Sequence, residues 1–216
     1  ESNWRPMPPG TVGISVREFF GDWTTARRSR LRIDCLDGRV APRPDANARR
    51  IASAFDLSAD WIVEGAINFW AHQSEKIAEA HPNAFVPSLS RSETKLPVVT
   101  HGWWDLDDDE ALIIELDNPQ AQFWAFQLAT SLWSTLEFAN RQTSLNMTQA
   151  HRDDDGRYRL VLSHVDPGVR NWLDTTGLRR GIPILRQYRA EPRQIPATRR
   201  VKIDQGETVL AGPRRC

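Results

Sequence analysis

Hydrophobic and polar positions alternate with a period of two over most of the C-terminal half of the chain, which is typical of half-buried β-strands. The clearest stretches are 112–116, 124–132, 145–147, 158–162 and 182–188. Segments rich in Asp, Asn, Pro and Gly, such as 117–119 and 153–156, separate them as turns. Val201 and Ile203 suggest a last edge strand. Several short antiparallel strands in succession predict a jelly-roll-like sandwich over residues 101–204.

The same alternation occurs near the start of the chain. Val12, Ile14 and Val16 share one face, and a second alternating stretch covers 31–35. A polar stretch containing Gly21 joins the two. We therefore expect residues 1–40 to supply strands that join the main sheet.

Between these β regions the period changes to that of a helix. Apolar residues from Trp61 to Ile77 recur at spacings of three and four, and Pro82 ends the pattern. A short helix is expected over 45–54, and Ser58 is a suitable N-cap for a longer one. Residues 45–81 are thus predicted to form a helical insert against a sheet, within a helix-and-loop region of 41–100. The fold class is mainly β (α+β), with a loose tail over 205–216.

Composition narrows the possible partners. The chain has 28 basic and 28 acidic residues, a formal net charge of +0. This balance gives no electrostatic case for a nucleic-acid or membrane-surface partner, despite a basic stretch over 189–202. The two cysteines form no disulfide framework, and no apolar run approaches the roughly 20 residues of a membrane span. The chain starts without Met, so we expect an N-terminal region to be missing, and the compartment is left open.

A series of polar and aromatic motifs gives the chain a family resemblance. The motifs are Asn3-Trp4, Pro6-Met7, Pro9-Gly10, Phe123-Trp124-Ala125-Phe126-Gln127-Leu128, Asn140-Arg141-Gln142-Thr143-Ser144-Leu145-Asn146, Gln149-Ala150, Asp155-Gly156-Arg157-Tyr158-Arg159, His164-Val165-Asp166-Pro167-Gly168 and Asn171-Trp172-Leu173-Asp174-Thr175. In this order and spacing the chain resembles the bacterial family catalogued as domain of unknown function 1214. The resemblance implies a jelly-roll-like C-terminal domain and supplies no activity.

The first candidate site lies in the segment 164–174. A histidine such as His164 is a common general acid or base, and Asp166 could fix its tautomer, which makes the pair the candidate catalytic acid–base residues. Asn171, Trp172 and Asp174 could bind a polar ring by hydrogen bonding and stacking. The alternative is a structured turn, because Asp-Pro-Gly sequences form tight turns by local hydrogen bonds alone.

The second candidate site lies in the segment 140–151. Arg141, beside Asn140 and Gln142, could clamp a carboxylate or phosphate. Asn146 and Thr148 are expected to face one side of a sheet together, and Gln149 is a further candidate ligand-binding residue. The alternatives are a solvated face and a structural ion pair. If the two segments form one site, they must meet in a concave pocket.

No metal or cofactor is predicted. The histidines occur without a His-x-His pair, and the acidic run 107–110 lacks the spacing of a calcium loop. The chain also has no Gly-rich phosphate loop and no nucleophile-elbow motif.

Two hypotheses of function follow. In the first, the chain is an enzyme or binder that acts on a polar small molecule such as a sugar or an organic acid. In the second, it is a non-catalytic interaction module, whose helical insert contacts the missing N-terminal region or another subunit. The second hypothesis predicts an exposed apolar patch on the helix.

Overall fold

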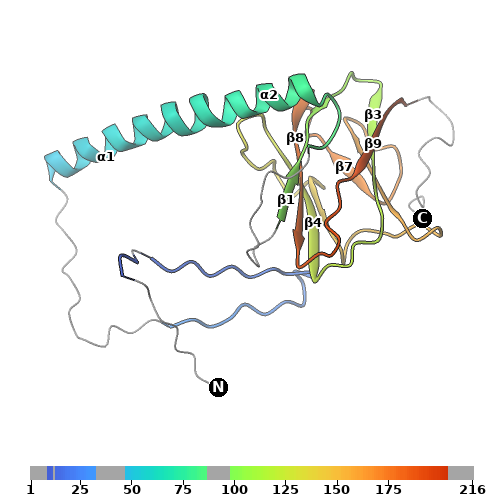
Figure 1. Cartoon of the computed structure of the whole chain (residues 1–216), viewed down its shortest axis with the longest axis horizontal. Helices are drawn as coiled ribbons and strands as arrows, with labels where there is room; N and C mark the ends of the chain where they lie inside the picture. The colour runs from blue at the N-terminus through green and yellow to red at the C-terminus, as the bar shows by residue number, and fades with distance from the viewer. Residues whose placement is uncertain (1–8, 12, 33–46, 87–97, 204–216) are drawn as a thin grey trace.

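The computed structural model describes residues 9–11, 13–32, 47–86 and 98–203 of the chain. Within them, nine strands form two sheets that face each other (Figure 1). The strands are β1 Val98–His101, β2 Trp104–Asp105, β3 Glu110–Leu116, β4 Phe123–Ala129, β5 Ser144–Asn146, β6 Tyr158–Ser163, β7 Trp172–Asp174, β8 Arg180–Tyr188 and β9 Ala197–Lys202. The predicted β sandwich is therefore confirmed.

The chain crosses repeatedly between the two sheets. One sheet has the order β1-β8-β4-β5, with β2 also pairing with β8, and the other has the order β7-β6-β3-β9. All pairs are antiparallel except β6 and β7, which run parallel. The turn predicted at 153–156 forms, with Gly156 at φ 85°. It links β5 and β6, which belong to different sheets, so it does not join two paired strands.

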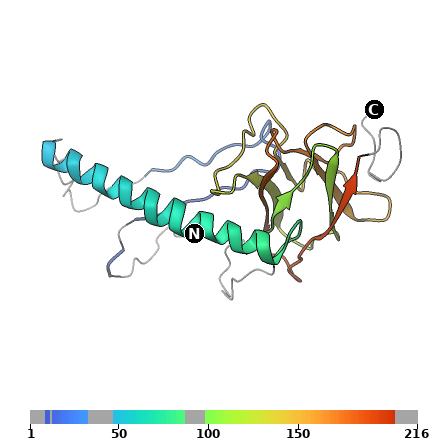
Figure 2. The ribbon, with the colours of Figure 1, turned by 90° about the horizontal axis from the view of Figure 1, so that it is seen from above.

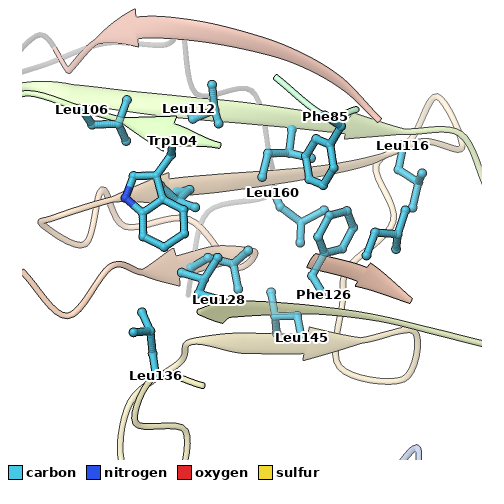
Figure 3. Close-up of a cluster of buried hydrophobic side chains, with 14 of the residues drawn as sticks. Phe85, Trp104, Leu106, Leu112, Leu116, Phe126, Leu128, Leu136, Leu145 and Leu160 are labelled. Carbon is cyan, nitrogen blue, oxygen red and sulfur yellow. The ribbon is translucent and has the colours of Figure 1, made fainter. Parts of the chain in front are cut away.

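Alternating side chains of both sheets fill the space between them. Trp124, Phe126 and Leu128 of β4 point inward and meet the apolar side chains of β3 and β6 (Figure 3). All three are at most 1% exposed. Because the period-two pattern places every second residue inward, the remaining side chains of β4 stand on the outer face of the sheet.

The helical insert is one continuous rod that projects away from the sandwich (Figures 1 and 2). It comprises α1 Ala48–Asp60, the π-helical η1 Trp61–Ala71 and α2 His72–Ala80. Asn47 is the N-cap and accepts a hydrogen bond from the Arg50 N–H. The predicted break at Ser58 is wrong, because the Ser58 hydroxyl donates to the Ala54 carbonyl inside the helix.

The sequence predicted that the whole helical insert lies against a sheet. In the structure only its last part does. Ile77 of α2 is buried against Ile182 and Ile184 of β8, whereas α1 and η1 contain no buried residue. Among the described residues, no helix has the length and apolar character needed to cross a membrane.

The predicted N-terminal strands are wrong in their described parts. Residues 13–32 form an extended arm with no strand pairing (blue in Figure 1). Val12, 33–35 and the predicted tail 205–216 lie outside the described residues. The division of the chain into the four predicted regions stays a prediction.

Candidate functional site

The candidate site lies on the outer face of the five-stranded sheet. Phe123, Ala125 and Gln127 of β4 are partly exposed there, between buried neighbours. The strand register places Arg186 of β8 beside Ala125, and Asn146 of β5 on its other side. These outward side chains form the floor of the site.

Two segments from distant parts of the chain cover the ends of this face. α2 packs over Ile182 and Ile184 at one end of β8. The N-terminal arm packs at the other end, where the Phe19 ring lies 5.3 Å from Phe123 and 5.7 Å from Tyr188 between ring centroids. Figure 1 shows both segments at opposite ends of β8. The floor between them is left accessible.

Asn146 fastens the arm to the sheet. Its side-chain NH₂ group donates to the Gly21 carbonyl at 2.8 Å and to the Phe20 carbonyl at 3.4 Å. Its side-chain oxygen accepts from the N–H groups of Thr148 and Gln149. Asn146 is only 5% exposed, so these contacts replace the water that its amide would otherwise bind.

The arm approaches the sheet so closely at Gly21 that a larger residue there would require Thr148 or the arm to shift. A Cβ atom on Gly21 would stand 2.5 Å from the Thr148 hydroxyl oxygen. On the far side of this contact, Trp23 packs edge-on against Phe138, with 5.9 Å between ring centroids. The arm therefore has three separate attachments, two aromatic and one polar.

The arm, the sheet floor and the loop after β4 line a cavity of about 1070 Å³ that is open to solvent. Its lining combines aromatic rings with side chains that bear hydrogen-bonding groups or charge. The principal lining residues are Phe19, Phe20, Trp23, Phe123, Phe138, Gln127, Asn140, Arg141, Gln142, Ser144, Asn146, Gln149, His151, Arg170, Arg186 and Glu18. This mixture of apolar walls and convergent polar groups is characteristic of small-molecule sites.

The two polar segments singled out in the sequence do meet. Arg141 Nε donates to a carboxylate oxygen of Asp174 at 2.7 Å. The Gln142 side chain donates to the backbone carbonyl of Trp172, and Asp174 N–H donates to the Gln142 carbonyl at 2.9 Å. This junction holds the wall of the cavity in place, because Arg141 and Gln142 both line it.

The predicted ligand-binding residues separate into two groups. Arg141, Asn146 and Gln149 line the cavity. Asn171, Trp172 and Asp174 support it from behind. Asn171 is 2% exposed and bridges the backbone of His151 and Arg159. The Trp172 indole donates to the Ser163 carbonyl at 3.3 Å, and Asp174 is 3% exposed beneath Arg141.

The predicted catalytic pair is not among the lining residues of the cavity. The His164 ring contacts the Thr175 hydroxyl at 2.8 Å and the Leu106 carbonyl at 3.2 Å, so both ring nitrogens are engaged. Asp166 accepts a hydrogen bond from the Gly168 N–H, and Gly168 has φ 78°. These contacts form the structured turn that was the alternative interpretation of this segment.

Several cavity residues carried no signal in the sequence analysis. Arg186 and Gln127 look like ordinary outward residues of alternating strands. Phe19, Phe20 and Trp23 could have been noticed, because three aromatic residues within five positions flank a glycine. Their role depends on a contact between residues about 125 positions apart, which periodicity does not reveal.

The arginines Arg141 and Arg186 at the cavity differ in the charge of their partners. Arg141 is paired with Asp174, and this contact raises the pKa of Arg141. Arg186 donates to Gln127 Oε1 at 2.7 Å, a neutral partner. Burial lowers the pKa of Arg186, and the nearby charge of Arg17 lowers it further.

The arrangement can bind, orient and hydrogen-bond a ligand. Among the residues that the structure describes, no three His, Cys, Asp or Glu side chains gather where they could hold a metal ion.

Comparison with known proteins finds no matching protein family and no matching curated protein. Among solved structures, a putative uncharacterized protein from Burkholderia cenocepacia is 27% identical with a TM-score of 0.64. The match covers 75% of this chain and 46% of that chain. The VPA0106 protein from Vibrio parahaemolyticus is 15% identical with a TM-score of 0.39, over 74% of this chain and 48% of that one. This chain thus spans just under half the length of either solved chain.

Proposed function

We propose that the chain binds a polar small molecule in the cavity beneath the N-terminal arm. The observation that carries this proposal is the cavity itself. Polar side chains from five separate segments converge in about 1070 Å³, next to aromatic walls. Pockets that hold small ligands have this size and this mixture of side chains.

The test is a thermal-shift screen of sugars and organic acids, since a ligand of the native state raises the melting temperature. Ala125 lies in the floor, so the Ala125→Leu variant fills part of the cavity. Ala197→Leu adds the same atoms at an exposed position of β9 in the other sheet. We expect hits that vanish in Ala125→Leu and persist in Ala197→Leu. Hits that survive in both variants, or no hits at all, would overturn the proposal.

We also propose that the chain belongs to the domain of unknown function 1214 family and has a bacterial source. The ordered motifs described above support membership. The 27% identity to a Burkholderia protein supports the source. A search started from an alignment of close homologues of this chain tests both, and its failure to reach that family would contradict membership.

A second candidate function, protein–protein interaction, is favoured by the helical insert. Eight large apolar side chains of α1 and η1 are 45–72% exposed. They are Ile51, Phe55, Leu57, Trp61, Ile62, Val63, Ile67 and Phe69. Exposed apolar side chains gathered on one element mark protein–protein interaction sites.

We propose a second copy of this chain as the partner. A stable interface buries about 800 Å² on each partner, and the same exposed helix of a second copy offers an apolar surface of matching character. Sedimentation velocity should show a dimer, and Trp61→Glu should convert it to monomer. Leu132→Glu places the same charge at an exposed loop position outside the helix and should leave the dimer intact. A monomeric wild-type chain would rule out the second copy and leave a different protein as the partner.

A further inference from the structure

The floor of the cavity contains a cation without a matching anion. Arg186 is partly buried in β8, with β1 and β4 on either side. Within the described residues, its guanidinium donates a hydrogen bond to the neutral Gln127. A guanidinium has five N–H donors, so most of its bonding capacity faces the cavity or the surrounding water.

The charges nearest to Arg186 do not neutralise it. Arg17 on the arm is close enough to disfavour a second positive charge at Arg186. Glu18 is the acidic residue of the lining, but its carboxylate accepts a hydrogen bond from the Ser29 N–H at 2.8 Å within the arm. Among the described residues, Arg186 therefore has no carboxylate within ion-pairing distance. Cations that are removed from water in this way are normally paired.

The walls beside Arg186 are apolar. Phe123 lies two residues from Ala125 on the same face of β4, and Phe19 packs on it from the arm. Phe138 and Trp23 form a second aromatic pair on the cavity wall. A ligand that contacts both Arg186 and these aromatic walls needs a charged end and an apolar body.

We propose that the ligand of this cavity is an organic acid, whose carboxylate forms a two-pronged ion pair with Arg186 and whose apolar body lies against Phe19 and Phe123. The planar guanidinium fork matches the two oxygens of a carboxylate. The anion would also reduce the repulsion between Arg186 and Arg17. This inference rests on the proposed binding function and adds the chemical class of the ligand.

Matched acids and amides test the charge requirement. Isothermal titration calorimetry would compare benzoate with benzamide, phenylacetate with phenylacetamide, and hexanoate with hexanamide. We expect at least one acid to bind about tenfold or more tightly than its amide, because hydrogen bonds to a charged group are the stronger ones. The side-chain NH₂ signals of Gln127 in a ¹H–¹⁵N spectrum should move on binding, since Gln127 contacts Arg186.

Two arginine variants locate the effect. Arg186→Gln should reduce the affinity for the acid to that for the amide. Arg199→Gln changes an exposed arginine of β9 in the other sheet and should leave the affinity unchanged. A melting temperature for each variant confirms that it is folded.

Two results would overturn the inference. The first is equal binding of every acid and its amide, and the second is full acid binding by Arg186→Gln. Neither would overturn the binding function, which is decided by the Ala125→Leu screen. Hits that survive in Ala125→Leu, or no hits with the wild type, would remove the cavity as a site for any ligand.

Discussion

Single residues at the cavity show a conflict between stability and binding. Arg186 carries a positive charge in a partly buried place, where its side-chain partner among the described residues is the neutral amide of Gln127. Charged groups in such places usually have an opposite charge beside them, because burial removes their water. Binding sites are where proteins tolerate this kind of cost.

The first prediction concerns the stability of Arg186→Gln without ligand. The variant removes the buried charge and keeps an NH₂ donor for Gln127. We expect the free energy of unfolding to rise by about 1 kcal/mol, measured by urea denaturation. A loss of stability of the same size would mean that the charge is already compensated in the free protein.

The second prediction concerns Asn146→Asp. The shape and the acceptor oxygen are retained, but the donor that faces the Gly21 and Phe20 carbonyls becomes a second oxygen. Because oxygen atoms then face each other without a proton, the variant should lose about 1–3 kcal/mol of stability. Asn118→Asp at an exposed turn is the matched control and should change little.

At the scale of elements, the arm is fixed by a few contacts and should detach as a unit. Extended segments without strand pairing have few backbone hydrogen bonds to hold them. The third prediction is that Gly21→Ala releases the arm, since its Cβ would stand 2.5 Å from the Thr148 hydroxyl oxygen. Trypsin should then cleave after Arg17, Arg27 or Arg28 several-fold faster, as measured by mass spectrometry.

Gly13→Ala is the control for this experiment, because a Cβ there meets nothing within 4 Å. It should leave the rate of cleavage unchanged. Equal rates in the wild type and in Gly21→Ala would mean that Thr148 moves aside and the arm stays attached.

The elements of the fold differ in how well the sequence predicted them. The strands β3, β4, β6 and β8 were predicted from alternating apolar positions, and the structure confirms them because those side chains are buried between the sheets or beneath α2. Residues 13–17 alternate just as well, yet they form no strand. Alternation records which side chains could share a face, and strand pairing also needs a partner with free hydrogen-bonding groups.

Pattern also located the helix without showing how it packs. The apolar residues of η1 lie on several sides of the helix, which is typical of a buried helix. In this chain they are exposed, as the interaction hypothesis predicted. At the cavity, Arg141, Asn146 and Gln149 were found because short polar motifs carry them. Arg186 was not found, because its place in the cavity depends on residues that are distant from it in the sequence.

At the scale of the molecule, the helix is joined to the sandwich through a small aromatic cluster. Trp133 lies between Trp70 of η1 and His101 of β1, with ring centroids 4.8 Å and 4.9 Å away. Its indole N–H donates to the Ser74 hydroxyl, which in turn donates to the Ser131 carbonyl. A positive charge on His101 would therefore lie inside this contact between the helix and the sandwich, which we call the joint.

The fourth prediction is that this joint weakens at mildly acidic pH. Burial lowers the pKa of His101 from its ordinary value of 6.5. The unfolded chain then takes up the proton more readily than the folded one, so stability is fully present above pH 6.5 and declines as the pH falls through the lowered pKa. The carboxyl groups whose pKa values are lowered, such as Glu110 with an ordinary value of 4.5, lose their contribution to stability only in more acidic solution.

The melting temperature of the wild type should fall between pH 6.5 and pH 5 more steeply than that of His101→Gln, whose glutamine binds no proton in this range. Parallel curves for the two proteins would show that His101 does not titrate in the joint.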